Sequence, residues 1–199
     1  MQVTEDVFKR RTESGGSIEI ICGSMFSGKT EELIRRIKRA RIARLSVEIF
    51  SPKADTRYGV NSLTSHNLSS IPSMPVDKAS AILLPGSQVQ VVAIDEAQFF
   101  DDELPAVCNA LANKGVRVIV AGLDMDFQGK PFGPVPAIMA IAESITKLHA
   151  VCVICGNPAL YSYRLSPENG QILIGEKESY EPRCRIHYNL DDSVDRNRD

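Results

Sequence analysis

Residues Gly23 to Thr30 read GSMFSGKT and fit the pattern G-x-x-x-x-G-K-[ST]. In this pattern glycines permit a tight turn, so that consecutive backbone N–H groups and the positive end of the following helix face phosphate oxygens. Lys29 then lies along the β and γ phosphates, and the Thr30 hydroxyl is a ligand of Mg²⁺. The octapeptide therefore predicts a site for ATP or a related nucleotide, bound with Mg²⁺. The predicted ATP-binding residues are Gly23, Ser24, Met25, Phe26, Ser27, Gly28, Lys29 and Thr30.

The flanks of this octapeptide are typical of a strand and a helix. Before it, Ile18 to Cys22 (IEIIC) is a β-branched run of the length of a buried strand. After it, Glu31 to Arg44 carries apolar residues at helical spacing, with acidic residues first and basic residues later. The alternative is an ordinary glycine-containing turn between a strand and a helix. The flanking pattern favours a phosphate loop.

The rest of the chain alternates short apolar runs with helical patterns. Strands are predicted at Val47 to Phe50, Val89 to Ile94 and Val116 to Ala121, and helices at Leu104 to Asn113 and Val135 to Lys147. This alternation indicates a parallel sheet with helices on both faces. Taken with the phosphate loop, we expect an α/β fold similar to that of P-loop NTPases (RecA-like). Between the strands, Ser51 to Pro85 is rich in Ser, Pro and Asn and contains a weak strand pattern at Ile71 to Val76. We interpret this segment, called the excursion below, as a long functional loop inserted between strands.

Composition limits the classes of function. A chain of 199 residues with a formal net charge of -2 suits a compact enzyme and argues against a nucleic-acid backbone as the main partner. No apolar stretch approaches the roughly 20 residues of a membrane helix, and the N-terminus lacks the apolar core of a signal peptide. We therefore expect a cytoplasmic protein with no membrane partner. The five cysteines, an odd number, suggest thiols and a metal site rather than a disulfide framework.

The second informative stretch is Val89 to Phe100, VQVVAIDEAQFF, in which a hydrophobic strand ends in two acids. An acid at the carboxyl end of a strand beside a phosphate loop holds Mg²⁺, so Asp95 is the candidate. Glu96 is the candidate base, because phosphoryl transfer requires that the attacking hydroxyl lose a proton. The alternative is that both acids merely begin a helix, where negative charge is favoured.

The third informative feature is a set of four potential metal ligands near the C-terminus. Two short-spaced pairs present their ligands on tight turns and can close a tetrahedral Zn²⁺ site, whose role is structural because all four positions are filled by the protein. The alternative for the histidine is a surface residue without a metal. Cys22 and Cys108 lie in apolar patterns and are interpreted as buried small hydrophobes. The predicted zinc ligands are Cys152, Cys155, Cys184 and His187.

These features divide the chain into four segments. Residues 1–16 and 189–199 are predicted to be mobile ends, because the first segment is polar, mixed in charge and ends in Ser-Gly-Gly and the second is almost entirely polar. Residues 17–149 form the α/β unit with the phosphate loop, and residues 150–188 form a small zinc-containing unit.

Together, the three features resemble the type II, cellular-type, thymidine kinase family over roughly Gly16 to Tyr188. Further matching motifs are DTRY at Asp55 to Tyr58, DEAQFF at Asp95 to Phe100 and GLDMDFQGKPFG at Gly122 to Gly133. Joint agreement of several motifs in one order is more specific than any one of them.

The resemblance implies transfer of the γ-phosphoryl group of ATP to the 5′-hydroxyl of thymidine or deoxyuridine, a salvage reaction that supplies pyrimidine nucleotides for DNA synthesis. It assigns Glu96 as the catalytic base, with Lys29 and Arg57 near the transferring phosphate. Asp55 falls in the same motif as Arg57, and its role, in fixing Arg57 or the metal, stays open. The family also implies a homotetramer and feedback inhibition by thymidine triphosphate.

The resemblance further implies that residues 150–188 bind the nucleoside through a loop that closes over the base, with its ends held by the zinc pairs. Ser162 stands where relatives commonly have threonine, and Gln171 stands where they often have an aliphatic residue. Recognition through backbone groups tolerates such changes. The implied nucleoside-binding residues are Phe99, Leu123, Phe127, Phe132, Ser162, Gln171, Ile172, Leu173, Ile174 and Tyr180.

Two other classes share parts of this pattern. One is a P-loop ATPase that acts on DNA, and the other is a nucleotide-regulated binding module whose zinc ribbon contacts a partner protein. The basic run Arg35 to Arg44 on the first helix would suit the former, but such a run is usually a solvated helix face. Intact Lys29, Thr30, Asp95 and Glu96 disfavour the latter.

Overall fold

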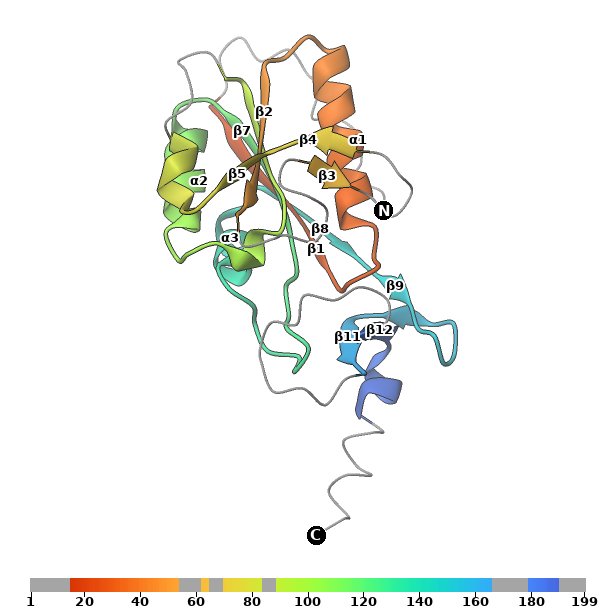
Figure 1. Cartoon of the computed structure of the whole chain (residues 1–199). Coiled ribbons are helices and arrows are strands. Elements are labelled where there is room, and N and C mark those ends of the chain that lie inside the picture. The colour runs from red at the N-terminus through yellow and green to blue at the C-terminus, as the bar shows by residue number, and fades with distance from the viewer. Residues whose placement is uncertain (1–14, 54–61, 65–69, 84–88, 166–178, 190–199) are drawn as a thin grey trace.

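The computed structural model describes residues 15–53, 62–64, 70–83, 89–165 and 179–189 (Figure 1). Its centre is a six-stranded sheet in the order β5-β2-β6-β7-β1-β8, in which neighbouring strands are all parallel. The strands of this sheet are β1 (Ser17–Gly23), β2 (Val47–Pro52), β5 (Met74–Val76), β6 (Val91–Ile94), β7 (Arg117–Gly122) and β8 (Ser144–Leu148).

Helices cover both faces of the sheet (Figure 1). Helix α1 (Lys29–Ile42) packs on one face through Leu33 and Ile37, which share a core cluster with Ile21 of β1. Helices α2 (Leu104–Asn113) and α3 (Val135–Ile141) cover the other face, where Ile20 of β1 lies in a second cluster. Successive strand residues point to opposite faces, so a strand covered on both sides is apolar almost throughout. The predicted fold class is confirmed.

The register brings three strand ends to the same edge of the sheet. Cys22 of β1 pairs with Gly122 of β7, and Ile94 of β6 pairs with Val120 of β7. The phosphate loop, the two acids after β6 and the segment after β7 therefore all begin at the carboxyl edge. Ligands of open parallel sheets bind at this edge.

The predicted helix at 135–147 is wrong in its second half. Helix α3 ends at Ile141, Ala142 is extended (φ -75, ψ 136), and the chain continues as strand β8. Helical spacing of apolar residues continues past Ile141, but the free edge of β1 offers a ladder of backbone hydrogen bonds. Ile145 and Thr146 are β-branched and suit that edge.

The predicted weak strand at 71–76 is two short strands in different sheets. Strand β4 (Ser70–Pro72) pairs antiparallel with β3 (Ser62–Thr64), whereas β5 extends the main sheet beside β2. Prolines at 72 and 75 interrupt the run, because proline lacks a backbone donor. The other predicted strands and helices are found, with ends shifted by a few residues, and short 3₁₀ helices η2 (Ala79–Leu83) and η3 (Ala97–Phe99) follow β5 and β6.

The C-terminal part lies beyond the carboxyl edge of the main sheet (Figure 1). It contains the antiparallel pair β9 (Ala150–Val151) and β10 (Pro158–Ala159), the antiparallel pair β11 (Tyr161–Arg164) and β12 (Tyr180–Arg183), and a short helical segment at residues 185–189. Throughout the described part of the chain, no helix has the length and apolar character needed to cross a bilayer.

Candidate active site and metal cluster

The phosphate loop connects β1 to α1 at the carboxyl edge of the sheet. A Cβ atom on Gly23 would lie 2.2 Å from the carbonyl oxygen of Leu148, so only glycine lets the loop begin this close to β8. Lys29 donates through Nζ to the carbonyl oxygen of Ser24 at 2.8 Å, which places its ammonium group against the loop. The predicted ATP-binding residues thus form a compact turn, with the ammonium group of Lys29 held against it.

The two predicted magnesium ligands lie together. Thr30, at the start of α1, donates through Oγ1 to Oδ2 of Asp95 at 3.3 Å, and Asp95 is only 4% exposed. Asp95 reaches the loop because β6 ends at Ile94, two strands away from β1 at the same edge. A hydroxyl and a carboxylate are the oxygen ligands that Mg²⁺ prefers, so the donor set fits this ion.

The predicted base follows directly. Glu96 has φ 50 and ψ 42, a left-handed conformation that is uncommon outside glycine. Its backbone N–H donates to Oδ1 of Asp95 at 3.0 Å, and its carboxylate oxygen Oε2 accepts a hydrogen bond from the side-chain amide of Gln98. Such backbone outliers cluster at functional sites, where surrounding contacts hold them.

One group of the implied nucleoside-binding residues lies after β6 and β7. The rings of Phe99 and Phe132 meet edge to face, with centroids 5.8 Å apart. The backbone N–H of Leu123 donates to Oε1 of Gln98 at 2.9 Å. This group therefore adjoins the acids after β6.

A second group involves the C-terminal part. The guanidinium of Arg164 lies 3.6 Å from the centre of the Phe127 ring and donates to the hydroxyl of Tyr180 at 2.7 Å. Ser162 accepts a hydrogen bond from the backbone N–H of Met25 at 3.0 Å, which ties β11 to the phosphate loop. Sequence reasoning missed Arg164; its position two residues after Ser162, on the same side of a strand, was the available signal.

Several predicted site residues lie outside the described residues. These are Arg57 and Asp55 in the excursion and Gln171, Ile172, Leu173 and Ile174 in the closing loop.

The four predicted zinc ligands converge, with their ligand atoms all within 4.8 Å of one another. Sγ of Cys155 lies 3.7 Å from Sγ of Cys184, and Nδ1 of His187 lies 3.2 Å from Cys184 and 3.6 Å from Cys152. Tetrahedral bonds of about 2.3 Å to sulfur and about 2.0 Å to nitrogen separate ligand atoms by roughly 3.5 to 3.8 Å. The quartet fits a zinc ion, and its four protein ligands support a structural role.

The thiols of the chain differ in ionisation. Burial alone would raise the pKa of Cys152, but hydrogen bonds from backbone groups of Cys184 and Ile154 lower that pKa to about 6, which favours the thiolate that binds metals. Burial raises the pKa of Cys22 to about 11 and that of Cys108 to about 12. These two thiols are buried in the core, as predicted from the sequence.

The metal cluster adjoins the phosphate loop. The side chain of Phe26 packs on a small core that includes Cys152, Ala159 and Cys184. Ser24 donates through Oγ to the carbonyl oxygen of Ala159 at 3.3 Å. Two residues of the loop therefore contact the part of the chain that carries the metal ligands.

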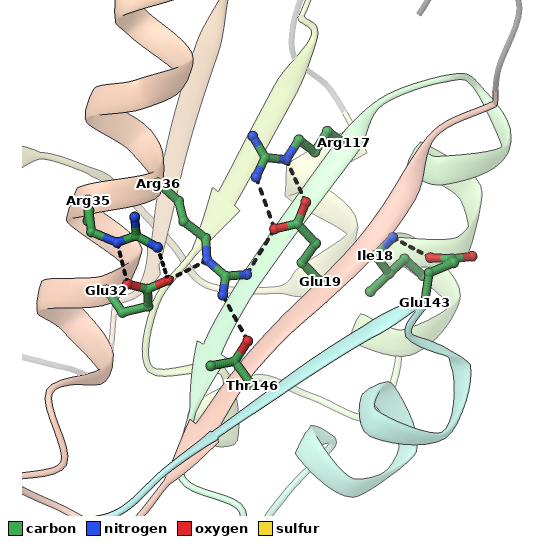
Figure 2. Close-up of polar contacts among 8 residues, drawn as sticks. All are labelled: Ile18, Glu19, Glu32, Arg35, Arg36, Arg117, Glu143 and Thr146. Carbon is green, nitrogen blue, oxygen red and sulfur yellow. Dashed lines mark hydrogen bonds and ion pairs between the residues drawn. The ribbon is translucent and has the colours of Figure 1, made fainter. Parts of the chain in front are cut away.

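A network of ion pairs holds helix α1 on the sheet (Figure 2). Glu19 of β1 accepts from Arg117 of β7 at 2.6 and 3.0 Å and from Arg36 of α1 at 2.9 Å. Arg36 also donates to Glu32 and to Thr146 of β8, both at 2.8 Å. The helix that begins at the phosphate loop is thereby bonded directly to β1 and β8, and through Glu19 to β7.

The basic run on α1 was predicted to be a solvated face. Most of its side chains are exposed, namely Arg35, Lys38, Arg39, Arg41 and Arg44. Arg36 differs, because its side chain is only 13% exposed and takes part in the buried network. Arg35 in turn donates to Glu32 and lowers the pKa of that carboxyl.

Fold and site define a P-loop nucleotide-binding α/β protein with a C-terminal Cys/His metal cluster. The family model described as thymidine kinase matches residues 16–188. A thymidine kinase of Bacteroides fragilis is 58% identical over 90% of each chain. That of Porphyromonas gingivalis is 58% identical over 87% of this chain and 85% of its own, and that of a Rhodothermus species is 55% identical over 91% and 85%. The chain belongs to the thymidine kinase family.

Proposed function

We propose that this chain transfers the γ-phosphoryl group of ATP to the 5′-hydroxyl of thymidine or deoxyuridine, in salvage of pyrimidine nucleotides for DNA synthesis. The observation that carries the proposal is the contact between Thr30 of the phosphate loop and Asp95, directly before Glu96, in a member of the thymidine kinase family.

The reaction forms a bond between the 5′-oxygen and the γ-phosphorus and breaks the bond between that phosphorus and the oxygen that leaves with ADP. Charge spreads over the γ-phosphoryl oxygens in the transition state, so a cation held beside the loop lowers the barrier. Lys29 is suited to this role, because its ammonium lies against the loop and needs only to exchange the Ser24 carbonyl for a phosphate oxygen. We assign Arg57 the same electrostatic role from the family motif.

Glu96 accepts the proton that the 5′-hydroxyl gives up. Support comes from its position directly after Asp95, whose carboxylate contacts Thr30 of the phosphate loop, and from its hydrogen bond to Gln98, which restricts where the Glu96 carboxylate points. A bound Mg²⁺, held through Thr30 and Asp95, would neutralise phosphate charge.

We propose that residues 17–149 bind ATP and that residues 150–188 bind the nucleoside. The two segments are in contact through aromatic residues, which supports a nucleoside site between them. The hydroxyl of Tyr188 donates to the carbonyl oxygen of Phe127 at 2.9 Å. From the family alone, we further propose a homotetramer inhibited by thymidine triphosphate. The cytoplasmic location stays a prediction.

Incubation with γ-labelled ATP and a panel of acceptors tests the proposal. The panel contains thymidine, deoxyuridine, deoxycytidine, deoxyguanosine and single-stranded DNA. We expect label on thymidine and deoxyuridine, and no stimulation of ATP hydrolysis by DNA. Hydrolysis stimulated by DNA without transfer to a nucleoside would support the ATPase alternative, and neither reaction would support a binding module.

A further inference from the structure

Gln98 is a polar side chain enclosed at the carboxyl edge of the sheet. It lies in η3, two residues after Glu96, and is 3% exposed. Buried amides must satisfy both their oxygen and their nitrogen, or stability is lost. Here both partners belong to the candidate site.

The direction of this amide is fixed by chemistry. The backbone N–H of Leu123 can only donate, so the atom that faces it at 2.9 Å must be the oxygen Oε1. The nitrogen Nε2 must then face the other way, where it donates to Oε2 of Glu96. A flipped amide would place two donors against each other at Leu123 and two acceptors against each other at Glu96.

Close packing leaves this side chain little room to rearrange. A Cβ atom on Gly133 would lie 2.3 Å from the carbonyl oxygen of Gln98, so only glycine fits there. A Cβ atom on Gly122 would lie 3.1 Å from Oε1 of the same residue. The backbone and the amide of Gln98 are both in contact with the segment that follows β7.

We propose that Gln98 is a positioning residue. It orients the Glu96 carboxylate toward the acceptor hydroxyl and holds it at a fixed position relative to Leu123, an implied nucleoside-binding residue. The inference rests on the proposed function, in which Glu96 is the base. Gln98 itself touches neither phosphate nor sugar in this role. It acts through its amide, because this one rigid group is hydrogen-bonded both to the Glu96 carboxylate and to the backbone N–H of Leu123.

The proposal predicts a loss confined to the chemical step. In Gln98→Met, similar in size, both hydrogen bonds disappear and the carboxylate gains freedom. We expect kcat to fall about tenfold to hundredfold, the scale of a misplacement of about 1 Å, while KM for ATP and thymidine changes less than about threefold.

A second variant separates the two ends of the amide. Gln98→Glu keeps an oxygen to accept from Leu123 but puts a second buried carboxyl against Glu96, and two carboxyls this close share one proton instead of both ionising. If Gln98 contacts the base, the shared proton makes Glu96 harder to ionise, so kcat falls at neutral pH and its pH profile moves to higher pH. If Gln98 only braces the segment after β7, Gln98→Glu keeps normal kcat, and the proposal is overturned.

The matched control is the same pair of substitutions at Gln90, just before the other end of β6. Gln90 is exposed, and its Oε1 accepts only from the backbone N–H of Ser46 among the contacts described, at 3.1 Å. Gln90→Met and Gln90→Glu should leave kcat unchanged. Thermal melting of all variants shows whether they fold; if Gln98→Met does not, Gln98→Glu carries the test.

A double-mutant cycle decides between positioning and general support of the fold. In a Glu96→Gln background no base is left to orient, so Gln98→Met or Gln98→Glu should lower kcat less than twofold further. A loss that multiplies with that of Glu96→Gln would overturn the proposal. If Glu96→Gln alone kept normal kcat, the proposed base would fail first, which distinguishes the two failures.

Discussion

At the residue scale, the proposed chemistry depends on Glu96. Its left-handed backbone is held by a hydrogen bond to Asp95 and its carboxylate by one to Gln98, so the residue is strained locally and supported by its neighbours. This combination suits a group that must meet a small acceptor in one orientation. ATP, in contrast, is proposed to be held by the phosphate loop.

Replacement of Glu96 by Gln tests this division of roles. The amide keeps the shape of the side chain but cannot accept the proton, so we expect turnover to fall at least about a hundredfold. ATP binding, measured by equilibrium titration, should stay nearly intact. The control is Glu103→Gln, an exposed acid at the start of α2, which should keep normal turnover. Near-normal turnover of Glu96→Gln would remove Glu96 from the base role.

Sequence predicts residues of this site where the spacing is local. Thr30 and Asp95 were predictable because Thr30 begins a recognisable helix and Asp95 follows a recognisable strand, both at one edge of a parallel sheet. The roles of Gln98, Arg164 and Arg36 were not, because each depends on a partner distant in the chain: Leu123, Phe127 and Glu19. Tertiary contacts of single polar residues leave no periodic signal.

At the scale of elements, helix α1 needs anchoring because it carries Lys29 and Thr30. Its apolar face packs on the sheet, and the buried charges of Glu19, Arg36 and Arg117 fix its position (Figure 2). Buried ion pairs cost desolvation, and removal of one partner leaves the other charge buried without compensation.

Replacement of Glu19 by Gln should destabilise the fold by about 3 kcal/mol, the low end for breaking a buried pair, because the amide oxygen can still accept. Urea denaturation measures this change. The control is Asp77→Asn, which breaks the exposed pair of Asp77 with Lys53 at 3.2 Å and should cost less than about 1 kcal/mol. Equal effects of the two substitutions would show that the network in Figure 2 does not stabilise the fold.

The error at residues 135–147 also belongs to this scale. Apolar spacing indicated a helix throughout, yet the chain turns at Ala142 and β8 completes the sheet beside β1. The carboxylate of Glu143 accepts from the backbone N–H of Ile18 at 2.6 Å and helps to fix this turn (Figure 2). Competition between a helix and a free sheet edge is decided by tertiary structure, which local periodicity does not contain.

At the scale of the whole molecule, the C-terminal part that carries the metal cluster is in contact with the phosphate loop. Ser24 and Phe26 of the phosphate loop contact Ala159 and the core around Cys152, and Ser162 contacts Met25. A zinc ion would hold the ends of the C-terminal part together, so that the nucleoside-binding residues and the loop keep one arrangement.

Replacement of Cys152 by Ser should therefore release zinc and weaken thymidine binding more than ATP binding. Solubility should fall as well, because the small core loses its staple. Metal analysis of the purified chain and calorimetric titration with thymidine measure these effects. Cys108→Ala, at a buried thiol outside the quartet, should retain zinc. Full activity of the Cys152 variant in the absence of metal would contradict the structural role.

The most direct test of the central claim is the identity of the product. The purified chain, given ATP, Mg²⁺ and thymidine, should form thymidine 5′-monophosphate with one ADP released per product, as mass spectrometry and phosphorus NMR can establish. With 5′-deoxythymidine, which lacks the acceptor hydroxyl, no phosphorylated nucleoside should appear. Phosphate on another position of the sugar, or ADP release without any nucleotide product, would contradict the account.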